Sequence, residues 1–269
     1  MAPYPDWLHV LAWVSLAFSC LCALGIIVDE FRRPQRMAIM NFVWPITALY
    51  FGPLAVAAYL RSGLKSTRRR HQRMMQQIEL ELARERAAGV EPRPPVSGPS
   101  LPTGEQVAVA VSHCGAGCTL GDIGAECWVF LMALTFAGGD FQTRILLDFL
   151  LAWSFGVAFQ YFTIAPLRGY SLRRGLLEAM RVDTLSIVAF QVGMSAWMAL
   201  TYFVIFPGPH LHPNQAVFWF MMQIAMVIGY FTCYPANVFL LKSGWKEKMP
   251  QSKQEMKRKT LERWNAQAA

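Results

Sequence analysis

Long apolar stretches separated by short charged ones constrain this chain more than any other feature. The apolar runs are about 18–25 residues long, the length of helix that crosses the hydrocarbon core of a bilayer. Only 16% of the residues are charged, whereas a soluble domain has about 25%. None of the runs alternates like a barrel strand, and backbone groups in hydrocarbon must be paired within their own helix. The pattern predicts an all-α membrane protein and argues against a soluble enzyme, a disordered chain or a secreted disulfide-rich domain.

Six of these runs are predicted to be transmembrane helices. They cover residues 7–28, 37–60, 119–137, 145–167, 184–206 and 215–241. The first two would form an N-terminal hairpin, residues 1–60, and the last four a C-terminal module, residues 106–245. Residues 61–105 combine a basic helix with a proline-rich linker, and residues 246–269 form a basic tail.

The positions of Lys and Arg predict the orientation, because these residues are enriched on the cytoplasmic side. The basic segments at 61–73, 168–181 and 242–263 fall on one side of a six-span chain, so this side and the C-terminus are predicted to be cytoplasmic. Arg32, Arg33 and Arg36 disagree, since six spans place them outside. A re-entrant second run would remove the conflict and put the N-terminus outside, but the length and apolar character of that run favour a full span.

The basic linker and tail predict contacts with anionic lipid. Residues 68–88 have a helical stripe of apolar side chains, among them Ile78 and Leu82, which is typical of a helix at a membrane interface. Nucleic acid is not an expected partner, because glutamates such as Glu79 and Glu81 interrupt the basic run.

The densest group of reactive side chains lies in residues 112–122, SHCGAGCTLGD. His113, Cys114 and Cys118 are soft or borderline ligands that suit copper or zinc. Asp122 and Glu126 follow in the same predicted span, where carboxylates are costly and mark functional positions. The alternative is structural: buried thiols, with glycines that let membrane helices pack closely.

Two local geometries are open for this segment. Thr119 and Asp122 have the spacing of a helix-capping box, so the helix would begin at Thr119 with its positive end at Cys118. If the helix begins earlier, Cys114, Cys118, Asp122 and Glu126 recur every four residues on one face. Both geometries bring the same side chains together.

Further candidate metal ligands lie elsewhere in the module, and each has a simpler explanation. Asp183 begins the fifth predicted span and is either a helix cap or a charge-compensating group. His210 and His212 in the last loop either share a metal or have no role. Met222 and Met226, one turn apart, either pass Cu(I) by thioether contacts or fill a lipid-facing surface.

Several longer motifs resemble an uncharacterised bacterial membrane family, domain-of-unknown-function family 4396. The matching runs are SHCGAGCTLGDI at 112–123, AFQYF at 158–162, DTLS at 183–186, HLHP at 210–213, WFMMQ at 219–223 and YPAN at 234–237. The resemblance covers about residues 107–249. It implies a protein of the bacterial inner membrane and brings no assigned activity.

Three functions are compatible with these residues. The leading hypothesis is a protein that binds or transports a copper-like metal ion, in exchange with metal-handling partner proteins. The second is a membrane thiol redox factor that uses Cys114 and Cys118. The third is a structural or assembly protein without a metal. An enzyme is not expected, because the chain has no hydrolase, P-loop or dinucleotide-binding motif.

Overall fold

The computed structural model describes residues 4–90, 101–135, 139–168, 171–249 and 253–268, and these ranges are helical with no strand. The prediction of an all-α fold is confirmed for them. The helices are α1 (Asp6–Arg32), α2 (Met40–Phe51), α3 (Pro53–Ala58), the π-helix η1 (Tyr59–Gly63), the 3₁₀-helix η2 (Leu64–Ser66), α4 (Arg68–Ala87), α5 (Gly104–Met132), α6 (Asp140–Arg168), α7 (Leu172–Leu200), the π-helix η3 (Thr201–Ile205), α8 (Ala216–Lys242) and α9 (Lys253–Ala268).

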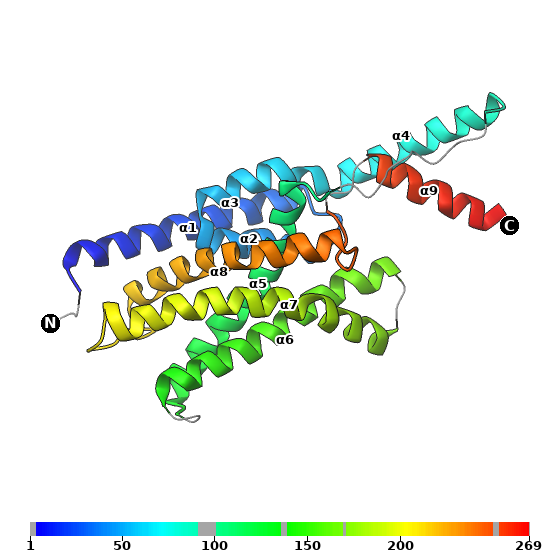
Figure 1. The fold of residues 1–269 in the computed structure, drawn as a ribbon. Helices are drawn as coiled ribbons and strands as arrows, with labels where there is room; N and C mark the ends of the chain where they lie inside the picture. Colours follow the sequence, from blue (N-terminus) through cyan, green and yellow to red (C-terminus); the bar gives the residue numbers. More distant parts are fainter. Residues whose placement is uncertain (1–3, 91–100, 136–138, 169–170, 250–252, 269) are drawn as a thin grey trace.

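Helices α5 to α8 pack into one bundle. Helix α5 lies mainly against α6, α6 against α7 and α7 against α8, and α8 closes the bundle by packing on α5 (Figure 1). Helices α1 and α2 pack on each other and on α5 and α8. The amide of Gln223 on α8 joins these parts: it donates to Ser19 Oγ (3.1 Å) and to the carbonyl oxygen of Leu49 (2.6 Å). Such bonds are the interhelical role expected of an amide within a membrane.

The predicted second span turns back on itself instead of crossing. Helix α2 ends at Gly52, whose φ of 51° reverses the chain, and α3, η1 and η2 return it to where it entered. Gln35 and Thr67 form an antiparallel bridge, with a backbone bond from Arg36 N to Ser66 O of 2.9 Å. Because the segment begins and ends at one place, it has the geometry of a re-entrant hairpin, with its tip beside Ser19 in the middle of α1.

The re-entrant hairpin gives the bundle two distinct ends. The "basic end" holds the end of α1, helices α4 and α9, the start of α5 and the chain after α8. The opposite end holds the N-terminal residues, with the ring of Tyr4 6.5 Å from that of Phe206. Arg32, Arg33 and Arg36 therefore lie at the same end as the other basic segments, which removes the conflict in the predicted orientation.

The six-span count is not confirmed. Four helices in the described ranges are long and apolar enough to cross a membrane: Asp6–Arg32, Phe141–Thr163, Leu172–Ile205 and Ala216–Lys242. Helix α2 has only 12 residues, and about 20 are needed to span the hydrocarbon. Helix α5 has 29 residues, but its polar positions lower its apolar character, and the other helices surround it.

Helices α4 and α9 project together from the basic end (Figure 1). The predicted helix at 68–88 is confirmed, but its apolar stripe packs on another helix instead of facing lipid. Ile78 and Leu82 are fully buried against Met256 and Leu261 of α9, and an ion pair joins Lys257 to Glu85. The proline-rich part of the predicted linker, residues 91–100, lies outside the described residues.

Candidate functional site

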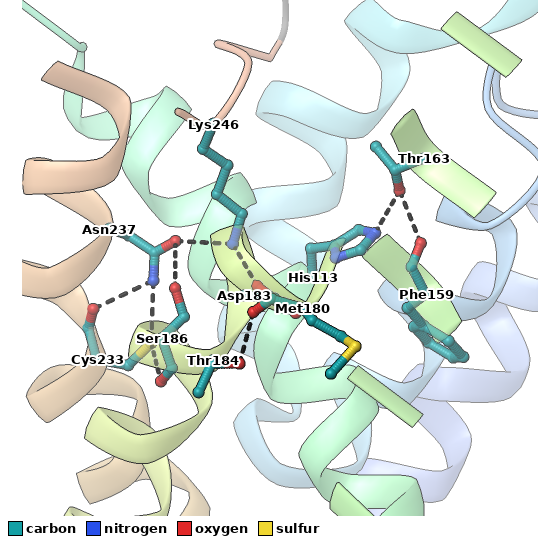
Figure 2. A network of polar contacts seen from close by, with 10 residues as sticks. All are labelled: His113, Phe159, Thr163, Met180, Asp183, Thr184, Ser186, Cys233, Asn237 and Lys246. Carbon is teal, nitrogen blue, oxygen red and sulfur yellow. Dashed lines mark hydrogen bonds and ion pairs between the residues drawn. The ribbon is translucent and has the colours of Figure 1, made fainter. Parts of the chain in front are cut away.

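A buried ion pair lies near the basic end of the bundle, between α7 and the chain that follows α8. Lys246 Nζ donates to Asp183 Oδ1 (2.9 Å) and to Asn237 Oδ1 on α8 (3.0 Å) (Figure 2). Asp183 is fully buried and Lys246 is 6% exposed. Gly244, with φ of 73°, turns the chain after α8, and Lys246 N bonds back to Leu240 O (3.1 Å). This turn aims a lysine from outside the helix into the bundle.

The interpretation of Asp183 as a helix cap is wrong. Helix α7 begins at Leu172, after the N-cap residue Ser171, so Asp183 lies well inside it. Its partner Lys246 was predicted only to mark the cytoplasmic tail. Sequence reasoning missed this pair because the two residues are 63 positions apart, and no local pattern connects them.

Three cysteine thiols meet beside the ion pair. Cys114 on α5 lies next to Cys118, one turn along the same helix, and next to Cys233 on α8. Cys233 Sγ donates to Ser186 O (3.2 Å) and accepts from Asn237 Nδ2 (3.0 Å). Asn237 thus connects the thiols to Lys246. The three cysteines are fully buried, and sequence reasoning did not include Cys233 among the ligands.

Helix α5 settles which of the two local geometries applies. It begins at Gly104 with a complete capping box formed by Thr103 and Gln106, so a cap at Thr119 is wrong. The hydroxyl of Thr119 instead donates back to Gly115 O (2.7 Å) within the helix. The alternative is confirmed: four side chains at intervals of four residues lie on one helix and all are buried, namely Cys114, Cys118, Asp122 and Glu126.

Two glycines of this motif have the packing role that was the simpler explanation. A Cβ on Gly117 would lie 2.7 Å from the Cα of Gly156, and a Cβ on Gly121 would lie 2.2 Å from the backbone nitrogen of Ala152. Both distances are far inside van der Waals contact. Glycine at these positions therefore allows α6 to approach α5 closely and brings the polar face of each helix toward the other.

Two buried carboxylates in the middle of the bundle have no cationic partner. Asp122 Oδ1 accepts from Gln191 Nε2 of α7 (2.9 Å), and Asp122 Oδ2 has no partner. Asp148 Oδ1 on α6 is also buried without a partner. In the part of the chain that the structure describes, neither forms an ion pair with Lys or Arg. A carboxylate in such surroundings is stable only when it is protonated or holds a bound cation.

A second ion pair lies toward the opposite end. Glu126 on α5 contacts the guanidinium of Arg144 on α6, and both side chains are buried. With Asp148 and Tyr202 they line a small cavity of about 30 Å³. From this pair through Asp148 and Asp122 to the thiols and Lys246, buried polar groups follow one another along the bundle, and we call this series the polar file.

The loop histidines lie outside this series. His210 stacks on Tyr202 with ring centroids 3.6 Å apart, and its Nδ1 is 3.0 Å from Phe206 O. His212 is exposed, and its backbone N–H bonds to Gln215. The structure places both at the opposite end from the thiols, and only His210 is near the polar file, through Tyr202.

Met222 and Met226 face the core of the bundle, so lipid-facing filler is the wrong interpretation of them. They are 3% and 2% exposed, and Met226 Sδ lies 3.6 Å from the hydroxyl of Thr119. His113 is likewise buried, but it points to α6, where its Nε2 meets Thr163 Oγ1 (2.8 Å) (Figure 2). The predicted ligands are thus divided between a thiol cluster, the carboxylates beyond it and separate histidines.

No group of three or more His, Cys, Asp or Glu side chains in the described ranges is placed to hold a metal ion. Metal binding by the predicted residues stays a prediction.

Comparison with known proteins gives one match. The sequence profile of a family described as "Domain of unknown function (DUF4396)" matches residues 103–246, which is more than half of the chain and includes the whole polar file. No curated protein and no solved structure matches the chain.

Proposed function

The chain belongs to the DUF4396 family, and on this premise we propose that it is a membrane carrier of a soft transition-metal ion, with Cu(I) as cargo. Its basic end would face the cytoplasm of a bacterium, because Lys and Arg concentrate there. The observation that carries the proposal is a line of buried thiols and carboxylates through the bundle that contains more acids than bases.

The charge balance of the polar file favours a cation. Among the described residues of the module and the chain just after it, four carboxylates are buried, Asp122, Glu126, Asp148 and Asp183, and two cations are buried with them, Arg144 and Lys246. Ion pairs account for Glu126 and Asp183. Burying the two remaining carboxylates as anions would cost several kcal/mol each. They are therefore suited to hold protons that leave when a cation passes.

The thiols favour Cu(I) over zinc. Structural zinc takes four ligands in a tetrahedron, and the described residues offer no preformed group of even three. Cu(I) prefers soft thiolate and thioether ligands and is stable between two thiolates. Cys114 and Cys233 lie side by side in the core, and Met226 and Met222 continue the soft ligands along α8.

Binding between two thiols has a definite charge balance. Two S–H bonds break, two Cu–S bonds form and two protons leave, so Cu(I) and two thiols give a complex of charge −1 without a change in oxidation state. The ammonium group of Lys246 reaches this site through Asn237. We infer that Lys246 offsets the charge of the complex.

Copper loading of the purified full-length protein tests the proposal. The protein is exposed to Cu(I) under anaerobic, reducing conditions with a competing chelator, and its metal content is measured. Wild type is expected to retain about one copper ion per chain, and Cys114→Ser with Cys233→Ser is expected to retain none. The matched control is Cys20→Ser with Cys22→Ser, because these α1 cysteines are not buried. Equal copper in both double variants would contradict a thiol site.

Uptake into proteoliposomes tests the carrier role separately. Asp122→Asn keeps the shape of the side chain but cannot exchange a proton, so Cu(I) uptake is expected to fall at least tenfold while binding to the thiols persists. Unchanged uptake would mean that the carboxylates of the polar file take no part.

The contact between Cys114 and Cys233 also favours a second function, a thiol redox factor. A disulfide between these two would link α5 to α8, which differs from the predicted pair Cys114 and Cys118. Complete burial of the thiols argues against direct exchange with a partner. Thiol trapping after reduction and after oxidation distinguishes the two functions, since only a redox factor changes its labelling while the metal content stays zero.

A further inference from the structure

A cavity opens at the basic end, and it shares Lys246 with the proposed metal site but none of the thiols. It has a volume of about 370 Å³ and lies where the re-entrant hairpin, α4, α5, α6 and the chain after α8 meet. This volume is in the range of pockets that hold small organic ligands. The antiparallel bridge between Gln35 and Thr67 holds two segments of the lining side by side, and these segments carry its two arginines, Arg36 and Arg70.

Positive charge exceeds negative charge in this lining: Glu105 and Glu247 also line the cavity, but they are paired with Lys65 and Lys259. Arg36 and Arg70 line the cavity, and neither forms an ion pair within the described ranges. By contrast, Lys65 and Lys253, which also line it, are paired with Glu105 and Glu81.

The crowding affects the protonation of two groups. Burial and the nearby charge of Arg263 lower the pKa of Arg36. Burial and the charges of Arg36 and Arg263 lower the pKa of His71, another lining residue. Cations that repel one another in a partly buried wall are stabilised when an anion binds between them.

Apolar side chains make up a further part of the lining. Met37, Met40, Met74 and Trp245 contribute to it, as expected for a pocket that encloses the apolar part of a ligand. At the inner wall His113 is 5% exposed and its Nδ1 has no partner. This ring nitrogen, on the side of the imidazole away from Thr163, is an unused polar group for a ligand.

The cavity continues toward the lipid-facing surface. Arg36 and Met37 also line a second hollow of about 500 Å³, together with Arg68, Phe42 and Phe162. Phe42 and Phe162 are each 61% exposed on the outside of the bundle. Arg36 therefore lies between a pocket lined by methionines and a hollow lined by two exposed phenylalanines, and an amphiphile could place its charged group at this arginine from either side.

We propose that this cavity binds an amphiphilic phosphate, with the phosphate group between Arg36 and Arg70 and the apolar part against the methionines or along Phe42 and Phe162. Guanidinium groups bind phosphate through paired, charge-assisted hydrogen bonds. Two sources have this chemistry: the headgroup of an anionic phospholipid, and a free organic phosphate from the aqueous side. The site would stabilise the contact between the re-entrant hairpin and the bundle.

Ligand-dependent thermal unfolding of the full-length protein in neutral detergent, with a chelator present to exclude metal, tests this site. The probes are phosphatidylglycerol and phosphatidylcholine in mixed micelles, phenyl phosphate and inorganic phosphate. Phosphatidylglycerol or phenyl phosphate is expected to raise the unfolding midpoint, and phosphatidylcholine is not. A response to the lipid alone identifies the membrane as the source, and a response to phenyl phosphate alone identifies a free phosphate.

Two double variants of equal charge make the test specific. Arg36→Gln with Arg70→Gln is expected to weaken the apparent affinity at least tenfold. Arg32→Gln with Arg69→Gln removes the same charge from exposed positions that do not line the cavity and is expected to leave the affinity within about twofold. Each variant is used only if it shows its own cooperative unfolding without ligand. Equal weakening in both variants, or no stabilisation of wild type by either amphiphile, would overturn the proposal.

Discussion

The ends and the middle of the polar file differ in whether their buried carboxylates have cationic partners. At the ends, carboxylates have cationic partners: Asp183 with Lys246 and Glu126 with Arg144. In the middle, Asp122 has only the amide of Gln191, and Asp148 has no partner for its buried oxygen. A paired charge at an end is fixed in place, whereas an unpaired acid in the middle can change its protonation or take up a cation. We therefore call the ion pair at each end a structural lock, meaning a buried pair that holds two parts of the bundle together. The middle is the part of the polar file where we expect protons or cations to move.

The largest effect is expected at a lock. Lys246→Met leaves Asp183 as an uncompensated charge in the bundle, so the free energy of unfolding should fall by about 3–5 kcal/mol. Thermal or denaturant unfolding in detergent measures the change. Adding Asp183→Asn removes the lone charge and should restore most of the loss. If the single variant is as stable as wild type, Lys246 is not a lock.

A smaller decrease in the free energy of unfolding is expected where α5 packs closely on α6, beside the middle of the polar file. Gly121→Ala places a Cβ 2.2 Å from a backbone atom of α6, so the helices must separate, at a cost of about 1–3 kcal/mol. The control is Gly124→Ala, whose Cβ would meet its nearest neighbour at 3.8 Å. Because alanine favours a helix, the control should be neutral or slightly stabilising. Equal losses in both variants would show that the close contact does not matter.

Because α5 begins at Gly104, its thiols lie near the Asp183–Lys246 lock at the basic end. Substituting the N-cap residue Thr103 tests this start of the helix. Thr103→Val should cost about 1 kcal/mol, because it removes the side-chain oxygen of the capping box. Thr119→Val should change stability by only about 0.5 kcal/mol or less, since the hydroxyl of Thr119 bonds back within the helix. Comparing the unfolding midpoints of the two variants reveals which threonine is the cap. A larger loss at Thr119 would contradict the observed start of α5.

The smallest effect on stability is expected in the middle of the file. Asp122→Asn replaces an acid that has no cationic partner, and the amide of Gln191 can still bond to it, so unfolding should change by about 0.5 kcal/mol or less. The same measurements as for Lys246→Met apply. A loss as large as at the lock would show that Asp122 is a compensated charge and would remove the distinction between ends and middle.

The sequence predicted one wall of the site and missed the groups that complete it. One of the two geometries left open by the sequence put Cys114, Cys118, Asp122 and Glu126 on one face, and the start of α5 at Gly104 selects it. The sequence could offer this alternative because helical periodicity is a local property. Cys233 and Lys246 were missed. Each meets its partner, Cys114 or Asp183, across more than 60 residues of chain, and the YPAN motif that follows Cys233 does not by itself indicate either contact.

Hydropathy alone also led to a wrong prediction for the second apolar run, which was expected to be a transmembrane span. Residues 37–60 are apolar enough for a span, but Gly52 with its positive φ breaks the helix, and the halves return to the same end. A window of residues reports whether a segment is apolar and not whether it turns back. The unexplained basic residues after α1 were the signal that favoured a re-entrant hairpin.

The sequence by itself determined the helical membrane character of the chain, the family to which it belongs and the acidic, thiol-bearing face of α5. These features depend on composition, on short motifs and on a period of 3.6 residues, all of which are local. The tertiary structure alone decided which acids have cationic partners, because this depends on how separate helices pack. It pairs Asp183 with Lys246, places Cys114 beside Cys233 and leaves Asp122 with the amide of Gln191 but no Lys or Arg among the described residues. In a low-dielectric interior that pairing determines whether a buried charge is a fixed support or a group free to exchange a proton.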